Sequence, residues 1–154
     1  MTATQTLVRT ASIDIKKFLP GLYPAVNALS DAVEPAGLEA ELIELVNLRA
    51  SQINGCAYCV QYHTSNLREM GVADAKITLA VAWQEAGIFS EREQAAFAWT
   101  EAITLIAHDH VPDTAYKAAR TVFSEPELVG LTAAIAAINV WNRFGVAFRY
   151  APEV

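Results

Sequence analysis

Basic clusters, long apolar runs and cysteine are all scarce in this sequence. Lys and Arg number 11 against 17 Asp and Glu, the formal net charge is -6, and no run of basic residues occurs. Binding to nucleic acid or to an anionic membrane surface depends on clustered Lys and Arg. We therefore expect neither a nucleic-acid partner nor a membrane partner.

Nothing in the chain has the pattern of a leader or a membrane anchor. The start, MTATQTLVRTASID, has no apolar stretch behind a basic start, and these polar residues predict a loosely held first dozen positions. The longest uncharged stretch runs from Leu128 to Asn142, which is shorter than the roughly 20 residues that cross a bilayer. We expect a cytoplasmic protein, in a compartment where thiols are kept reduced.

Strand patterns are rare, whereas helix signals follow one another along the chain. An apolar stripe at helical spacing covers residues 38–53, and further helical segments cover about 73–86 and 91–107. Ser90 with Glu93, and Ser124 with Glu127, have the spacing of capping boxes. The sequence predicts an all-α single domain over residues 1–154, built from six to seven helices.

The chain is apolar for its size. Hydrophobic residues make up 53% of it and charged residues only 18%. A small domain has a large surface relative to its volume, so part of this apolar surface is expected to lie between subunits. We expect an obligate homo-oligomer.

The two cysteines lie in one short stretch, NGCAYCVQYH. Asn54-Gly55 breaks the chain direction, and a helix is expected from about Cys56 to Met70. Cys59 lies three positions beyond Cys56 and His63 four beyond Cys59, so all three share one helix face. The first turn of a helix favours a thiolate, and lowering a thiol pKa from 8.5 to about 7 takes roughly 2 kcal/mol.

Glu44 lies on the helix that precedes this break. The Asn54-Gly55 turn lets the two helices fold against each other, so that Glu44 can face the cysteine pair, although the spacing alone leaves this open. A carboxylate beside His63 would hold the orientation of the ring and its ability to accept a proton.

Taken alone, these residues allow three interpretations. They can form a redox pair with a proton carrier, or a zinc site made of Cys56, Cys59, His63 and Glu44, although structural zinc favours more sulfur ligands. They can also be two small apolar side chains packed between helices. The attacking sulfur stays open too, because Cys56 has the helix terminus and Cys59 has the closer histidine.

Three further residues are secondary candidates. Tyr58, between the cysteines, is expected to pack beside the site or to line its access. Asn142 and Arg143 interrupt an apolar helix and need polar partners if they are buried. They can bond across a subunit interface, support the site, or lie on a solvated edge.

In this spacing, Glu44, Cys56-Ala57-Tyr58-Cys59 and His63 resemble the core signature of the alkylhydroperoxidase D-like (AhpD-like) proteins, in the carboxymuconolactone decarboxylase-like superfamily. The resemblance is strongest over residues 38–87 and extends more loosely to AIAAINVWNRFGVAFRY near the C-terminus. It implies an AhpD-like all-α fold that assembles as a homotrimer or homohexamer.

The resemblance also implies a thiol-dependent peroxidase that acts on hydroperoxides and binds no cofactor. Cys59 would attack, Cys56 would resolve the intermediate to a redox-active disulfide, and Glu44 with His63 would relay protons. An external dithiol donor, such as a lipoyl protein, would restore the thiols. The best-known members carry a histidine where Tyr58 stands here. The alternatives are a non-catalytic redox sensor or disulfide-exchange protein and, less favoured, a carboxymuconolactone decarboxylase-type enzyme or a metal-binding module.

Overall fold

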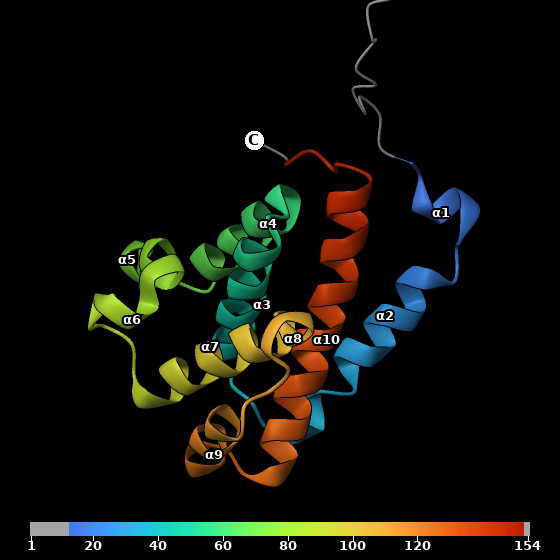
Figure 1. The fold of residues 1–154 in the computed structure, drawn as a ribbon. Helices are drawn as coiled ribbons and strands as arrows, with labels where there is room; N and C mark the ends of the chain where they lie inside the picture. The colour runs from blue at the N-terminus through green and yellow to red at the C-terminus, as the bar shows by residue number, and fades with distance from the viewer. Residues whose placement is uncertain (1–12, 153–154) are drawn as a thin grey trace, which may run out of the picture.

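The computed structural model describes residues 13–152, and over this range the chain is helical without strands (Figure 1). The all-α prediction is therefore confirmed, whereas the expectation for the first dozen residues falls outside the described range. The helices of ten residues or more are α2 (Leu22–Asp31), α3 (Ala40–Asn54), α4 (Ala57–Glu69), α7 (Glu91–Thr104), α9 (Asp113–Val122) and α10 (Glu125–Ala147).

Short helical segments connect the long helices. They are α1 (Ile15–Phe18), η1 (Glu34–Ala36), α5 (Asp74–Leu79), η2 (Ala80–Ala82), α6 (Trp83–Ala86) and α8 (Ile106–Asp109). The single helix predicted over about 73–86 is thus interrupted by a 3-10 turn. Side chains three apart eclipse in such a turn, so Ala80 and Trp83 both lie in the core. The helix predicted over 91–107 likewise ends at Thr104, before α8.

Both predicted capping boxes are present. The hydroxyls of Ser90 and Ser124 accept hydrogen bonds from the backbone N–H groups of Glu93 and Glu127, whose carboxylates in turn accept from the cap backbone. Each box satisfies two N–H groups that a helix start would otherwise leave unpaired. These local signals define where α7 and α10 begin.

The long C-terminal helix α10 organises the domain. It packs against α2, α3, α4, α7 and α9, and Figure 1 shows it running between α2 on one side and α3 and α4 on the other. Fully buried side chains such as Val46, Leu131 and Ile135 join α3 to α10. A second core around Leu45, Leu67 and Phe97 joins α3 to α4 and α7. This arrangement brings the C-terminal half of α10 over the start of α4.

No helix within residues 13–152 combines the length and the apolar character that a bilayer crossing requires.

Candidate active site

A two-residue reversal positions the cysteines. Helix α3 ends at Asn54, Gly55 takes up the left-handed conformation (φ 66°), and Cys56 is the N-cap of α4. Glycine adopts this conformation without the penalty that a Cβ imposes. The turn places Cys59 in the first turn of α4, where a disulfide joins it to Cys56. Cys56 is 1% exposed and Cys59 5% exposed, so the pair is largely withdrawn from solvent.

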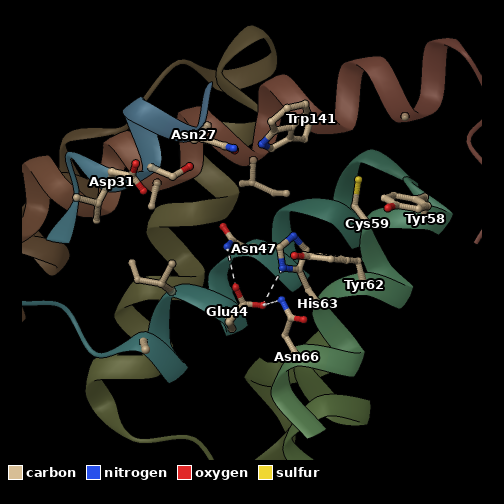
Figure 2. A pocket seen from close by; sticks show the side chains of 18 of the residues that line it. Asn27, Asp31, Glu44, Asn47, Tyr58, Cys59, Tyr62, His63, Asn66 and Trp141 are labelled. Atoms are coloured by element: carbon tan, nitrogen blue, oxygen red, sulfur yellow. Dashed lines mark hydrogen bonds and ion pairs between the residues drawn. The ribbon is translucent and has the colours of Figure 1, made fainter. Parts of the chain in front are cut away.

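His63 and Glu44 form a hydrogen-bonded pair beside the disulfide. Nδ1 of His63 lies 2.8 Å from Oε2 of Glu44, which joins α4 to α3. The Glu44 carboxylate also accepts from the side-chain amides of Asn66, at 3.2 Å, and Asn47, at 3.5 Å (Figure 2). His63 is 7% exposed. The structure therefore brings Glu44 to His63, which the sequence spacing had left open.

The environment keeps Glu44 ionised. Burial raises the pKa of Glu44, but the hydrogen bond and charge of His63 and the two amides outweigh it, and the pKa lies below its ordinary value. A carboxylate only accepts, so Nδ1 of His63 carries the hydrogen of this bond. When the ring is neutral, the lone pair of Nε2 is available to take up a proton.

A cleft opens beside these residues. Its volume is about 1010 Å³, and its walls come from α2, α3, α4 and α10. Cys59 and His63 both line it, whereas Cys56 does not. Figure 2 shows Trp141 of α10 and the tyrosines of α4 at the end of the cleft nearest Cys59, and Asp31 of α2 at the other end. Cys59 is therefore the cysteine that a small molecule in the cleft would meet.

Tyr58 lies in this cleft, as expected for a group that lines the access. Its ring stacks on Tyr62 and meets Tyr150 edge-on, each with ring centroids 6.3 Å apart. Tyr62 in turn meets His63 edge-on at 5.2 Å. An aromatic layer thus extends from the imidazole to the C-terminal segment.

Asn142 belongs to an amide network behind the disulfide. It is 1% exposed, accepts from Asn54 Nδ2 at 2.8 Å and donates to Ser51 Oγ at 3.0 Å. Asn54 also donates to Asn139 Oδ1 at 3.0 Å. The network fastens the end of α3 to α10 and so supports the turn that carries Cys56. It does not border the cleft.

Arg143 lies outside the cleft, on the exposed side of α10. Its guanidinium donates to the carbonyl oxygen and Oδ1 of Asn139, one turn earlier on α10, and the residue is exposed. It contributes nothing to the lining of the cleft. Of the secondary candidates, only Tyr58 reaches the site directly.

Gly145 is a site residue that sequence reasoning missed. A Cβ added here would lie 2.6 Å from the sulfur of Cys56 and 3.6 Å from that of Cys59. The absence of a side chain therefore lets α10 pass directly over the disulfide. A glycine inside an apolar helical pattern was the available signal, because such a residue often has a packing or functional reason.

Within the described part of the chain, no three His, Cys, Asp or Glu side chains are grouped so that they could hold a metal ion. Cys56 and Cys59 are bonded to each other, and Glu44 is bonded to His63. The four side chains that a zinc site would have used are thus arranged as two separate pairs.

An all-α domain in which one cysteine of a CxxC disulfide, an imidazole and a carboxylate line the same cleft defines the class of the molecule. The chain belongs to the carboxymuconolactone decarboxylase family, which residues 20–102 match. It is 42% identical over 104 residues to the uncharacterized protein YdfG of Bacillus subtilis (strain 168), covering 68% of this chain and 71% of that protein.

Solved structures agree with this assignment. A crystal structure from Agrobacterium tumefaciens has a TM-score of 0.89 and 42% identity, and covers 94% of this chain and 99% of that one. That protein is of unknown function, and a role in antioxidant defence as an AhpD has been suggested for it. The resemblance to AhpD-like proteins is thereby confirmed. The debrominase Bmp8 shares the fold, with a TM-score of 0.78 at 23% identity over 90% of this chain and 74% of that one.

Proposed function

We propose that this protein is a thiol-dependent peroxidase that reduces organic hydroperoxides. The observation that carries the proposal is the Cys56–Cys59 disulfide, whose Cys59 end shares a cleft with the His63–Glu44 pair. The fold alone does not choose the chemistry, because the same fold serves a debrominase. The dithiol, a proton carrier and its orienting carboxylate supply what peroxide reduction requires.

Reduction of the hydroperoxide begins with both cysteines in the thiol form. His63 Nε2 takes the proton of Cys59, and the thiolate attacks the oxygen of ROOH that bears hydrogen. An S–O bond forms, the O–O bond breaks, and the leaving alkoxide receives the proton from His63 and departs as ROH. Cys59 is now a sulfenic acid. Glu44 holds the imidazolium through its Nδ1–H while the charge develops.

The second step closes the disulfide. Cys56 attacks the Cys59 sulfur, an S–S bond forms, and the S–O bond breaks. The departing hydroxide combines with the Cys56 proton and leaves as water. The two cysteines have together lost the two electrons that the hydroperoxide gained. An external dithiol donor, for which a lipoyl-bearing protein has suitable chemistry, then reduces the disulfide by exchange and is itself oxidised.

Access supports Cys59 as the attacking sulfur. Cys59 lines the cleft and lies one turn from His63 on α4, whereas Cys56 lies beneath Gly145 of α10. Cys56 is instead the N-cap, where the free N–H groups of the first helical turn favour a thiolate. A stabilised Cys56 thiolate suits the resolving cysteine, which is also the leaving group when the donor dithiol attacks Cys59. Tyr58 stands where the best-known AhpD-like members carry a histidine, so His63 is the proton carrier on this face of α4.

The oligomeric state and the cellular compartment are part of the same proposal. We infer a homo-oligomer, because exposed apolar side chains such as Val81, Leu105 and Val129 remain on the single chain. The resemblance to AhpD-like proteins implies that it is a homotrimer or homohexamer. A reducing compartment such as the cytoplasm would supply the donor. The suggested antioxidant role of the relative from Agrobacterium tumefaciens supports the peroxidase proposal itself.

The test compares the parent protein with Cys56→Ser and Cys59→Ser, using cumene hydroperoxide and dihydrolipoamide. We expect both variants to lose turnover. A sulfenic acid that reacts with dimedone should accumulate in Cys56→Ser and be absent from Cys59→Ser. Equal turnover in all three proteins would end the proposal, and the reverse pattern of trapping would exchange the two roles. A clean disulfide without turnover would instead identify a redox sensor or disulfide-exchange protein.

A further inference from the structure

Aromatic and apolar side chains form the end of the cleft nearest Cys59. Trp141 of α10 and Tyr58 and Tyr62 of α4 lie at this end (Figure 2). Phe144 of α10 also lines the cleft. Trp141 is itself braced by Tyr23 of α2, with ring centroids 4.8 Å apart. Such surfaces favour the burial of an apolar group. The volume of about 1010 Å³ lies at the upper end of sites that hold drug-sized ligands, and far exceeds what hydrogen peroxide would need.

The charged groups of the same cleft have one sign. Four carboxylate side chains line it, namely Asp31, Glu34, Glu44 and Glu69, and its described lining includes neither Lys nor Arg. Glu44 is paired with His63. Within residues 13–152, Asp31, Glu34 and Glu69 take part in no ion pair, and all three are exposed.

We infer that the cleft selects uncharged organic hydroperoxides with a bulky aromatic or branched apolar group, and disfavours hydroperoxides that carry a carboxylate. This inference rests on the proposed function and specifies its substrate class. An anionic substrate would approach the Cys59 thiolate past Asp31, Glu34 and Glu69, and no Lys or Arg of the described lining would receive it. The imidazole in the lining, that of His63, is already bonded to the Glu44 carboxylate. Wall charges of one sign change the local concentration of a charged ligand, and the effect weakens as salt is added.

The lack of Lys and Arg in the described lining also distinguishes this cleft from a site that binds a lactone carrying a carboxylate. A site that binds carboxylate substrates typically presents Arg, because its planar guanidinium forms two parallel hydrogen bonds to the carboxylate. Arg143, the arginine of α10, bonds to Asn139 instead and lies outside the cleft. The cleft therefore suits an uncharged substrate.

The experiment uses two matched probes, cumene hydroperoxide with a para-carboxamide and with a para-carboxylate. The two have nearly the same size and differ in charge. Dihydrolipoamide reduces the Cys56–Cys59 disulfide after each turnover. At low ionic strength, we expect kcat/KM to be about tenfold higher for the carboxamide probe than for the carboxylate probe. The gap should narrow in high salt. Equal values for the two probes at low ionic strength would overturn the inference and leave the peroxidase proposal intact.

Two triple variants show whether the charges of the cleft are responsible. Asp31→Asn/Glu34→Gln/Glu69→Gln removes three carboxylates from the cleft. The control, Glu85→Gln/Glu91→Gln/Asp109→Asn, removes three exposed carboxylates elsewhere and changes the net charge equally. We expect the first variant to close the gap between the probes and the control to preserve it. The same gap in both variants would contradict the inference.

A binding measurement keeps the inference testable if no hydroperoxide is turned over. The product alcohols of the two probes are titrated against the oxidised protein, and the fluorescence of Trp141 reports binding. Trp141→Phe identifies the part of the signal that comes from the cleft. We expect the carboxamide alcohol to bind about tenfold more tightly than the carboxylate. Equal binding would refute the charge selectivity, whereas selective binding without turnover would refute only the peroxidase activity.

Discussion

Replacing Gly145 by alanine tests how closely α10 and the disulfide are fitted together. The added Cβ would lie 2.6 Å from the sulfur of Cys56 and 3.6 Å from that of Cys59. Unstrained contacts between such atoms begin at about 3.5 Å, so the overlap with Cys56 is about 1 Å and the contact with Cys59 is ordinary. Either the end of α10 or the turn at Cys56 must move by a comparable amount.

The expected loss of stability is small because two effects oppose each other. Overpacking of a filled core costs about 1–3 kcal/mol. Alanine in place of glycine inside a helix contributes about 1 kcal/mol of stability. The free energy of unfolding should therefore fall by up to about 2 kcal/mol. The effect on the reaction should be larger, since a displacement near 1 Å between reacting groups can slow a reaction by up to about 100-fold.

The assays separate the two effects. Urea unfolding gives the stability, and rapid mixing with peroxide followed by dimedone trapping gives the rate at which the Cys59 sulfenic acid closes to the disulfide. Gly130→Ala is the matched control, because a Cβ at this second α10 glycine would overlap the Cβ of Ala36 and lie away from the sulfurs. We expect a stability loss in both variants and slow closure only in Gly145→Ala. Normal closure in Gly145→Ala, or equally slow closure in both variants, would refute the reasoning.

Three further outcomes are expected. Glu44→Gln should lower the peroxide reaction rate on the order of 10–100-fold, because the His63 imidazolium loses its charged partner; stopped-flow kinetics measure this. Asn142→Leu should reduce the free energy of unfolding by about 2 kcal/mol in urea titrations, because Asn54 loses an acceptor at the CxxC turn. Hydrogen bonds from the Ser124 backbone, the Ser124 hydroxyl and Arg92 lower the pKa of Glu127 to about 2. The stability that these bonds contribute is fully present above about pH 4.5 and should be lost as the pH falls toward 2. Thermal unfolding at a series of pH values measures this.

Each of these outcomes has a result that would contradict it, and two have a control variant. Glu41→Gln changes a glutamate of α3 that pairs with Lys76 instead, and it should react at the parental rate. A parental rate in Glu44→Gln would remove Glu44 from the relay. Asn142→Leu with unchanged stability would show that the amide network does not support the turn. Glu127→Gln should flatten the acid dependence, and an unaltered pH profile in that variant would assign the decline to other carboxylates.

The helices and their starts were predictable because they depend on neighbours in the sequence. Ser90 and Ser124 bond to N–H groups three residues on, and the capping boxes were confirmed for that reason. The break between α5 and α6 was not predictable in the same way. It depends on Trp83 reaching the core and donating to Glu101 of α7 at 2.8 Å, a contact between separate helices.

The site residues also fall into those that local spacing predicts and those that depend on packing between helices. The spacing of Cys56, Cys59 and His63 placed them on one face of a helix, because the helical repeat brings residues three and four apart together. The sequence alone therefore contained a dithiol beside an imidazole. It could not establish that Glu44 reaches His63, since that contact depends on how α3 packs against α4.

The remaining features depend on tertiary packing. Gly145 meets Cys56, and Asn142 meets Asn54 88 positions away, only because α10 folds back over the start of α4. The cleft requires α2 on the opposite side of α10, and no local pattern encodes that placement. Short-range periodicity decides which side chains share a helix face, whereas the fit between faces distant in sequence decides what those side chains meet.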